Sequence, residues 1–433
     1  MAEDRIPISK TARAGKFLKT GLNVAGDYIG HYGKKAVGLK TTRADLDRKM
    51  ATSLMDGFTD LRGAALKVAQ MMSMDTTNLS PDFTAILQKA QSNVPPMSGP
   101  LAVKMFTNEI GKHPEEVFDR FNMHAHKAAS LGQVHEAWKD GQKLAVKIQY
   151  PGVAESLKSD LQVIRSLARQ VAPRFLNTPS STIDHYAQEV EDRLTEELDY
   201  RIELENSIAF SQLCAEVPGI VFPRYYPEYS RRRVLTMEWI EGKHLKEFMA
   251  HHPTEADRNR VGQVLWDYFE YQLHVLQRMN TDTHPGNFLF REDGTVGVLD
   301  FGSTKVIPRP LYDAVIHAVH PRFYDDPAAA RPVLETLELL RPEDTPEDTQ
   351  KWMQLFRKMT DYTLTAYREG RFRFANPAFW NGAKEIGKEL EDTREPRGSK
   401  DFLFISRAYL GLFSILRDLD AELDTRPTYL NWG

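Results

Sequence analysis

The chain has 433 residues, of which 41% are hydrophobic and 27% are charged, and its formal net charge at pH 7 is −4. A chain of this length buries a substantial core and is expected to form two or three domain-sized pieces. The weakly negative charge argues against a general nucleic-acid binder. The single cysteine, Cys214, excludes an internal disulfide framework and indicates a reducing compartment such as the cytoplasm. No histidine-containing arrangement singles it out, so we expect a packed thiol rather than a nucleophile.

The first forty residues are basic, with eight Lys or Arg against three acidic residues. Apolar residues recur in this segment at helical spacing, at Leu18, Leu22, Ala25, Ile29 and Tyr32. Two interpretations fit this pattern. The helix either makes a peripheral contact with anionic lipid, or it packs on the rest of the domain and leaves its lysines in solvent.

No stretch reaches the eighteen apolar residues that a membrane-spanning helix needs. Residues 402–416 come nearest, but Arg407 interrupts them. The chain begins with Glu3 and Asp4 and has no apolar secretory region, which weakens a signal- or transit-peptide interpretation. We therefore expect no transmembrane segment, with peripheral membrane association as the alternative to a purely cytoplasmic location.

Residues 43–75 are expected to form one long amphipathic helix. Apolar residues recur there every three or four positions, at Leu46, Met50, Leu54, Phe58, Leu61, Ala65, Val68 and Met72. Lys67 and Gln70 share a face beside this stripe, and periodicity alone makes them ordinary solvent-side residues. The stretch 94–100, rich in proline, then reads as a linker.

An apolar, β-prone segment at 144–148 carries Lys147 and follows a turn at Asp140-Gly141. It matches the V-A-I-K strand whose lysine contacts the α- and β-phosphates of ATP in kinases. A lysine on a strand is more often a solvated residue. The preceding segment, 127–137, favours the kinase interpretation because it lies where the glycine-rich phosphate loop is expected, although it carries alanines. Since the Cβ of alanine restricts close approach to phosphate, we expect an altered nucleotide pose or affinity.

The strongest signal lies between Asp282 and Gly302. Asn287 follows Asp282 by five residues, and Asp300-Phe301-Gly302 begins thirteen residues later. This spacing is typical of a kinase site, in which one carboxylate faces the nucleophile while an Asn and an Asp hold Mg²⁺ on the phosphates. Two short apolar strands, 288–290 and 296–299, predict a hairpin that brings Asn287 and Asp300 together. Each short motif is weak alone, and the joint spacing carries the prediction.

With these motifs in place, the sequence resembles the UbiB-like, aarF-domain atypical kinases, a family linked to ubiquinone and other isoprenoid-lipid metabolism. Residues 66–70 resemble the family's K-x-G-Q signature, and residues 128–133 resemble its alanine-rich loop. Glu197-Leu198-Asp199 is similar to the E-x-D motif, and residues 281–287 are close to the catalytic loop of bacterial members. The resemblance covers about residues 5–420.

The resemblance implies an α+β, atypical bilobal protein kinase-like fold with an N-terminal helical extension that covers the active site. We expect the extension at residues 1–114 and a small lobe with the alanine-rich loop and a family insertion at 115–242. A mostly helical large lobe is expected at 243–433. Residues 239–242 would form the hinge between the lobes, with backbone groups available for adenine.

The resemblance also implies site residues. Lys67 is expected to contact Glu197 and Asp199, and Glu203 is expected to form the ion pair that orients Lys147. The expected catalytic set is Lys67, Gln70, Lys147, Glu197, Asp199, Glu203 and Asp282. ATP would contact Lys147, Ala128, Ala129, Ser130, Gly132, Gln133, Glu238 and Ile240. Mg²⁺ would be held by Asn287 and Asp300.

Two residues depart from the family pattern. The glycine of the K-x-G-Q helix is Ala69, so a methyl group occupies a close-packed position. The proline that usually follows the catalytic aspartate is Thr283, which is expected to change only the stiffness of the loop.

Three functions remain open. The favoured one is an Mg-ATP-dependent atypical kinase or ATPase that supports isoprenoid-quinone (ubiquinone) biosynthesis or related lipid metabolism, with a lipid or quinone precursor as partner. The alternatives are an aminoglycoside- or choline-kinase-like small-molecule phosphotransferase and a nucleotide-binding scaffold with low turnover. A docked protein substrate is not expected, because no Ala-Pro-Glu motif follows Gly302 and residue 281 is Thr instead of Arg.

Overall fold

A computed structural model gives the fold of the chain. It describes residues 43–61, 96–128, 131–175, 197–320, 322–393 and 397–426, together with parts of 15–31, 188–195 and 428–429. The chain divides into two compact units. The first comprises Met1–Leu204 with Arg224–Trp239, and the second comprises Glu205–Pro223 with Ile240–Gly433.

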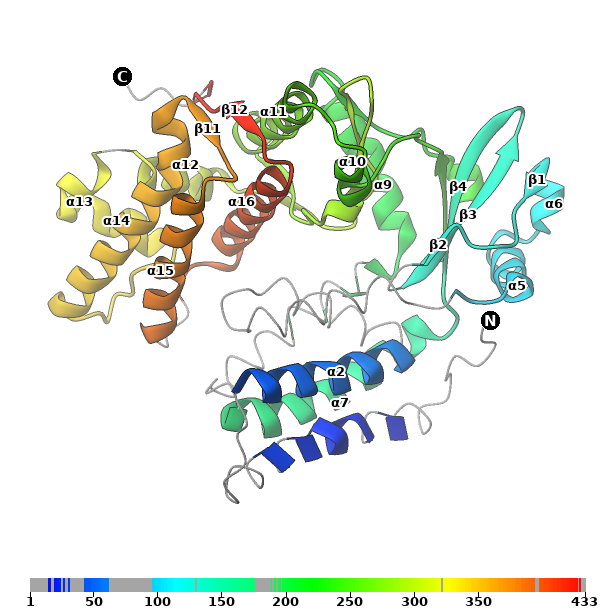
Figure 1. The fold of residues 1–433 in the computed structure, drawn as a ribbon, viewed down its shortest axis with the longest axis horizontal. Coiled ribbons are helices and arrows are strands. Elements are labelled where there is room, and N and C mark those ends of the chain that lie inside the picture. Colours follow the sequence, from blue (N-terminus) through cyan, green and yellow to red (C-terminus); the bar gives the residue numbers. More distant parts are fainter. Residues whose placement is uncertain are drawn as a thin grey trace. The chain divides into compact units, whose positions relative to one another are not determined.

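The first unit contains an antiparallel sheet of five strands (Figure 1). Strand order is β1-β3-β4-β6, and β2 also pairs with β3. The strands are β1 (Arg120–Phe121), β2 (Lys127–Ala128), β3 (Gly132–Lys139), β4 (Gln142–Gln149) and β6 (Val234–Glu238). The two-residue turn between β3 and β4 has φ values of 50° at Asp140 and 74° at Gly141. Both values are positive, as a tight hairpin turn between twisted strands requires.

Strand β4 has two different faces. Leu144, Val146 and Ile148 alternate along it and are at most 1% exposed, within an apolar cluster to which helix α5 (Gly99–Ile110) also contributes. Lys147 points to the opposite face, since successive side chains of a strand alternate. Its neighbours across the sheet are Val134 on β3 and Leu235 on β6.

Three longer helices begin in the first unit: α2 (Arg43–Leu61), α7 (Val153–Phe175) and α9 (Tyr200–Leu213). Helix α2 is the described part of the helix predicted at 43–75, and Leu46 and Met50 of the predicted stripe are buried. The preceding segment packs against α2, because a Cβ built at Gly57 would collide with the side chain of Thr20. Leu22 of the predicted lipid-facing stripe is 64% exposed.

The second unit is mainly helical. Its strands form small sheets: β5 (Ile220–Val221), β8 (Phe288–Phe290) and β9 (Val296–Val298) in one; β7 (Arg278–Asn280) with β10 (Thr304–Val306); and β11 (Arg371–Arg373) with β12 (Glu422–Asp424). All these pairs are antiparallel except β5 with β9. The helices are α10 (Leu245–Ala250), α11 (Glu255–Tyr271), α12 (Arg309–Ala318), α13 (Pro327–Thr336), α14 (Pro346–Glu369), α15 (Pro377–Thr393) and α16 (Lys400–Asp418).

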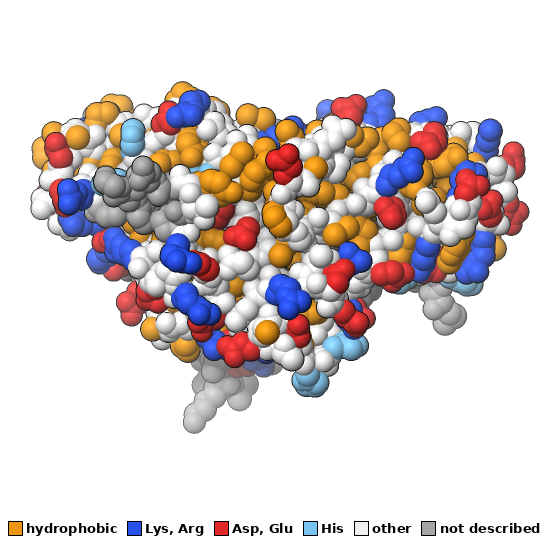
Figure 2. Space-filling model, turned by 90° about the horizontal axis from the view of Figure 1, so that it is seen from above, with side chains coloured by type: hydrophobic (Ala, Val, Ile, Leu, Met, Phe, Trp, Pro, Cys, Tyr) orange, Lys and Arg blue, Asp and Glu red, His pale blue; other side chains and the backbone are white. Residues whose placement is uncertain are grey.

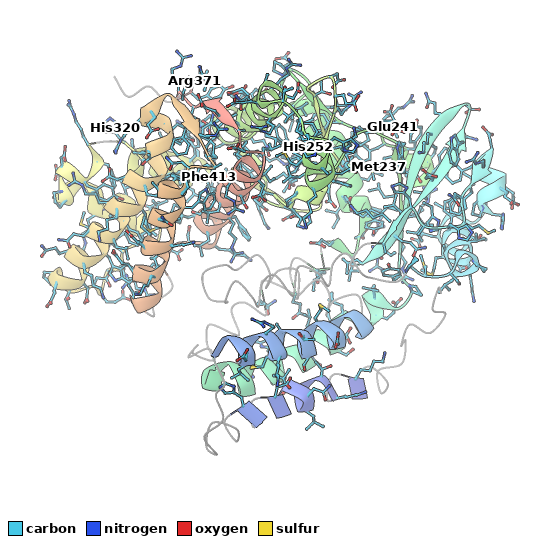
Figure 3. The ribbon with its side chains drawn as sticks, in the orientation of Figure 1. Met237, Glu241, His252, His320, Arg371 and Phe413 are labelled. Carbon is cyan, nitrogen blue, oxygen red and sulfur yellow. The ribbon has the colours of Figure 1, made fainter. Side chains whose placement is uncertain are left out.

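An aromatic cluster joins the helices of the second unit. Phe413 on α16, labelled in Figure 3, lies 5.1 Å from the ring of Phe374 and 6.3 Å from that of Trp266 on α11. All three rings are at most 2% exposed. Helix α11 ends in a π-helical turn, Gln272–Leu276, which leads directly into β7. The core therefore fixes both α16 and the segment that enters the predicted catalytic loop.

None of the described helices is long and apolar enough to cross a membrane.

Candidate active site

In the first unit, Lys147 forms an ion pair with both carboxylate oxygens of Glu203. The lysine Nζ lies 2.8 and 2.9 Å from the two carboxylate oxygens of Glu203, which is 4% exposed. The ring of Tyr200, one turn before Glu203 on α9, lies 4.8 Å from the same Nζ. The structure thus brings together the two residues predicted to pair and adds a cation–π contact that sequence analysis had not identified.

The E-x-D segment, Glu197 to Asp199, is held by residues that motif spacing does not reveal. The buried Gln149 at the end of β4 donates its side-chain amide to the carbonyl of Leu198 (3.0 Å). Arg201 donates its Nε and its main-chain N–H to Asp199 Oδ1 at 2.9 and 3.1 Å. Hydrogen bonds from Arg201, followed by its charge and that of Arg232, hold the pKa of Asp199 below its usual value against an opposing effect of burial.

The family resemblance implies that the helix around Lys67 contacts this motif. Lys67, Gln70 and Ala69 lie outside the described residues. The contact of Lys67 with Glu197 and Asp199, and the site role of Gln70, therefore remain predictions. The described cationic partners of Asp199 are Arg201 and Arg232, the latter at 4.0 Å.

The alanine-rich loop is described only in part, since Ala129 and Ser130 lie outside the described residues and Ala128 ends β2. Gly132 is needed for strand pairing, because a Cβ there would lie 3.0 Å from the Cα of Gln149 and closer still to a carbonyl of β4. Gln133 is fully buried. Its Oε1 accepts from the N–H of Met97 (2.7 Å), and its Nε2 lies 2.8 Å from Nε2 of His135. These contacts hold Gln133 within the packing around β3, and its contact with nucleotide remains a prediction.

The predicted hinge begins where β6 ends, between the labelled Met237 and Glu241 of Figure 3. The N–H of Glu238 donates to the carbonyl of Arg224 (2.7 Å), and its carboxylate accepts from the N–H of Arg224 (3.1 Å). The N–H of Trp239 donates to the carbonyl of Lys143. The Glu238 N–H is thus bonded within the protein, and the contacts of Glu238 and Ile240 with ATP remain predictions.

In the second unit, the loop around Asp282 is organised by Asn280. This asparagine is 2% exposed, and its Oδ1 accepts from the N–H of Asp282 (3.1 Å). Its Nδ2 donates to the carbonyl of Asp300 (2.7 Å). Its own N–H donates to Oε1 of Gln272 (2.7 Å), a fully buried residue of the π-helical turn. Sequence analysis did not identify Asn280 and Gln272 as residues that hold this loop, because nothing in their spacing distinguishes buried amides from exposed ones.

The predicted hairpin is present. Its strand pairing places Asn287 opposite Leu299, the residue before Asp300. Phe288 pairs with Val298, and the N–H of Leu299 donates to the carbonyl of Asn287 (3.0 Å). Asn287 also donates its Nδ2 to the carbonyl of Asp282 (3.1 Å). Asp300 Oδ1 accepts from the N–H of Gly302 (2.8 Å).

These residues fit a magnesium ion. Because Nδ2 of Asn287 is engaged with protein, Oδ1 is the atom that the amide presents as a ligand. Asp300 adds a carboxylate, and Mg²⁺ is typically bound by one or two such groups together with substrate phosphates and water. Among the described residues, no group of three or more His, Cys, Asp or Glu side chains could hold a metal. A carboxylate with one amide oxygen is suited to a metal that arrives with a nucleotide, because phosphates and water supply the other ligands.

The segment after Gly302 is short, and its strand β10 pairs with β7. Thr304 pairs with Asn280, and the N–H of Thr281 donates to the carbonyl of Ser303 (2.9 Å). The hydroxyls of Thr281 and Ser303 are also hydrogen-bonded, at 2.9 Å. Residue 281, an arginine in many protein kinases, is thus used to join the two strands. Thr283 is also buried, at 3% exposure, although we had expected it to affect only loop stiffness.

Cys214 takes no part in this site. It is 1% exposed, and burial raises the pKa of its thiol to about 12. A thiol that stays protonated is a poor nucleophile, which agrees with the predicted packing role.

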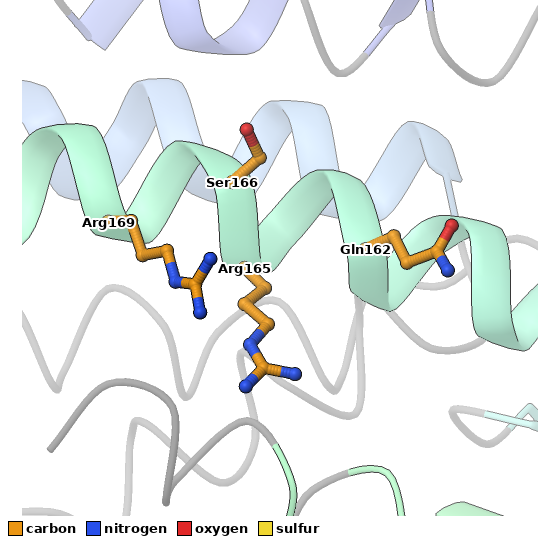
Figure 4. A pocket seen from close by; sticks show the side chains of 4 residues that line it. All are labelled: Gln162, Arg165, Ser166 and Arg169. Carbon is orange, nitrogen blue, oxygen red and sulfur yellow. The ribbon is translucent and has the colours of Figure 1, made fainter. Parts of the chain in front are cut away.

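One pocket among the described residues shares no residue with the predicted site. This pocket along α7 is lined by Gln162, Arg165, Ser166 and Arg169, and the two arginines point to the same side of the helix (Figure 4). On the face drawn in Figure 2, basic and acidic side chains of the described residues lie interspersed with apolar ones. This mixture agrees with the small net charge of the chain.

Comparison with known proteins identifies the family. The sequence model of the ABC1 atypical kinase-like domain matches residues 89–327, more than half of the chain. An uncharacterized chloroplastic aarF domain-containing protein kinase of Arabidopsis thaliana is 32% identical over 345 residues, covering 78% of this chain and 47% of the relative. The mitochondrial atypical kinase COQ8B of Danio rerio is 28% identical over 355 residues, covering 78% and 55% respectively. The chain spans about half the length of these relatives.

A solved structure shows the same fold. The complex of Rv3197 with erythromycin from Mycobacterium tuberculosis matches with a TM-score of 0.59 and 24% identity, covering 88% of this chain and 95% of that one. The expected mixed helix-and-sheet, kinase-like fold is thereby confirmed, as is the family resemblance seen in the sequence motifs. This chain belongs to the ABC1, or aarF-domain, family of atypical kinase-like proteins.

Proposed function

We propose that the chain is an Mg-ATP-dependent atypical kinase or ATPase that supports isoprenoid-quinone biosynthesis, such as that of ubiquinone, or related lipid metabolism. The observation that carries the proposal is the hydrogen-bonded loop in which Asn287 donates to Asp282 and Asn280 joins Asp282 to Asp300. Three oxygen-bearing groups held in this way are what phosphoryl transfer requires.

In this proposal, Lys147 contacts the α- and β-phosphates of ATP. The carboxylate of Glu203 holds the lysine side chain extended, and the ring of Tyr200 stabilises its charge. Asn287 and Asp300 hold Mg²⁺, which neutralises phosphate charge when bound. The carboxylate of Asp282 accepts the proton of the attacking hydroxyl.

The acceptor is water or a small hydroxylated molecule, with an isoprenoid lipid or quinone precursor as the favoured class. The strand β10 follows Ser303 immediately and pairs with β7, and α12 begins at Arg309. This short connection supports a small acceptor over a protein substrate, which usually docks on a long activation segment. Membership of this family, whose UbiB-like members are linked to ubiquinone, supports the link to quinone metabolism.

A peripheral contact with anionic membrane is part of the proposal. It rests on the eight basic residues among the first forty and on the exposure of Leu22. Sedimentation of the full chain with anionic liposomes, and its loss on deletion of residues 1–40 or in high salt, tests this point separately from catalysis.

The central experiment measures phosphate release from Mg-ATP by the purified chain with and without isoprenoid-lipid vesicles. Asp282→Asn removes the proton acceptor while keeping the shape of the side chain, so release should fall about 100-fold or more, within the range of general-base catalysis. Asp293→Asn is the matched control, since Asp293 lies in the hairpin turn and its hydrogen bonds with Thr295 are exposed. Activity restricted to aminoglycosides or choline-like alcohols would instead identify a small-molecule phosphotransferase. Nucleotide binding without turnover under any condition would identify a scaffold.

A further inference from the structure

Helix α16 comes very close to the predicted catalytic loop at Gly411. Thr283 directly follows Asp282, and its side chain is 3% exposed. The residue opposite is Gly411 of α16: a Cβ built there would lie 2.6 Å from the Cβ of Thr283 and nearer still to its Oγ1. Real Cβ atoms essentially never approach a neighbour within 3.0 Å. The two residues therefore fit together only because Gly411 has no side chain.

Rotation of the threonine side chain does not remove this conflict. A change of χ1 moves Oγ1 and Cγ2, whereas the Cβ of Thr283 is fixed by the backbone of the loop. An alanine at position 411 would therefore force the helix or the loop to move by about 1 Å to reach an ordinary contact distance.

We expect the loop to move more than the helix. Ala408 and Leu412, which flank Gly411 on α16, are fully buried, and Phe413 packs in the aromatic cluster with Trp266 and Phe374. In the loop, Thr283 is buried, but its neighbours Asp282 and His284 are only half-buried and are held by hydrogen bonds. A close-packed core resists displacement more strongly than such a loop.

We propose that Gly411 is a positioning residue: the bare backbone of α16 at this point sets the depth of Thr283 and thereby the position of the Asp282 carboxylate. This inference rests on the proposed function, in which Asp282 is the catalytic carboxylate. It also explains why a threonine can occupy position 283, since its hydroxyl and methyl groups enter a space that a side chain at residue 411 would fill.

The first test is Gly411→Ala in the full chain. Turnover of Mg-ATP should fall about 10- to 100-fold, since a displacement of about 1 Å has effects of that size on catalysis. The half-saturating ATP concentration should stay within about twofold, because Lys147 and its partner Glu203 are untouched. Gly387→Ala on α15 is the matched control, since it also adds a methyl group to a helical glycine and nothing lies within 4 Å of it.

The second test is rescue by shortening the threonine. Thr283→Gly in the Gly411→Ala background removes the Cβ conflict and should restore most of the lost turnover. Thr283→Ala in the same background keeps the Cβ of residue 283, which lies 2.6 Å from the Cβ of residue 411. This variant should therefore restore less of the turnover. A role of Gly411 in helix stability alone predicts no such order of rescue.

Amide hydrogen exchange gives a readout that does not depend on catalysis. The N–H groups of Asp282 and His284 donate to Asn280 and Asp282, so Gly411→Ala should speed their exchange about tenfold or more while Gly387→Ala leaves it unchanged. Wild-type turnover and exchange in Gly411→Ala, or a loss that Thr283→Gly does not reverse, would overturn the inference. If the wild-type chain shows no turnover, the proposed function fails, and the exchange rates alone decide whether Gly411 positions the loop.

Discussion

The side chain of Asn280 donates to the main-chain carbonyl of Asp300 at 2.7 Å. The same side chain accepts from the N–H of Asp282 at 3.1 Å. One buried amide thus joins the proposed proton acceptor to the proposed metal ligand. Because an amide has a donor and an acceptor at fixed spacing, it sets the distance between the two backbone segments more firmly than a hydroxyl could.

Replacement of Asn280 by Ala should reduce turnover more than it reduces ATP affinity. It leaves the half-buried carbonyl of Asp300 and N–H of Asp282 without these partners, and each lost hydrogen bond costs about 1 kcal/mol. Steady-state phosphate release should fall about 10- to 100-fold as the loop loses its geometry.

Asn259→Ala is the control for this variant. Asn259 lies in the same unit, and its Oδ1 accepts from the N–H of Glu422 (2.8 Å), away from the loop. It should lower the melting temperature without a specific loss of turnover. Equal activity losses in the two variants would show that Asn280 contributes only to stability.

Replacement of Glu203 by Gln should weaken ATP binding about tenfold. The glutamine keeps the length of the side chain but removes the negative charge that holds Lys147 at 2.8 Å. Charge-assisted hydrogen bonds are roughly twice as strong as neutral ones. Titration with a non-hydrolysable ATP analogue measures the effect. Glu205→Gln, an exposed neighbour on α9, should bind the analogue like wild type, and an equal loss there would argue against a specific role for Glu203.

The catalytic hairpin was predictable because the sequence alone carries its features. The apolar strands around residues 288–290 and 296–298 and the intervening turn predict the pairing that the structure contains. Lys147 and Glu203 were predictable only through the family motifs, since 56 residues separate them in sequence.

The sequence did not reveal the structural roles of three amide residues, Gln133, Gln149 and Asn280. A glutamine or asparagine looks the same in a sequence whether it is solvated or fully buried, and all three are buried with hydrogen-bonded amides. The partners, such as the N–H of Met97 for Gln133, come from segments that periodicity does not relate. The close approach of Gly411 to Thr283 was likewise invisible, because it joins residues 128 positions apart through tertiary packing alone.

A buried ion pair in the second unit should control its stability at low pH. Arg397 donates to both carboxylate oxygens of Asp344 at 2.7 and 2.9 Å, and both side chains are at most 5% exposed. These hydrogen bonds hold the pKa of Asp344 below its usual value. A lowered carboxyl pKa means that the stabilisation is present above the unfolded-state pKa, near 4, and is lost as the pH falls through the folded-state pKa.

Urea unfolding of the wild type and of Asp344→Asn at several pH values tests whether this stabilisation is lost at low pH. The variant should be about 3 kcal/mol less stable at pH 7, because it leaves a buried arginine without its counter-charge. The difference should shrink steadily below about pH 4, as Asp344 is protonated in the wild type. Asp361→Asn removes the exposed pair with Arg368 and should change stability by less than about 1 kcal/mol. A difference between wild type and Asp344→Asn that is independent of pH would contradict the ion-pair explanation.

Replacement of Asp300 by Asn tests the metal assignment directly. The asparagine Oδ1 can still accept from the N–H of Gly302, and the Asn280 contact uses the main-chain carbonyl, so the fold should be kept. Removal of the carboxylate charge should weaken ATP binding in the presence of Mg²⁺ about tenfold or more, since hard divalent cations depend on carboxylate ligands. Calorimetric titration of ATP with Mg²⁺ and with EDTA measures this, and the wild type should respond strongly to the metal while the variant does not. If the folded variant keeps the wild-type response to Mg²⁺, Asp300 is not a metal ligand, and the kinase-like assignment of the loop fails with it.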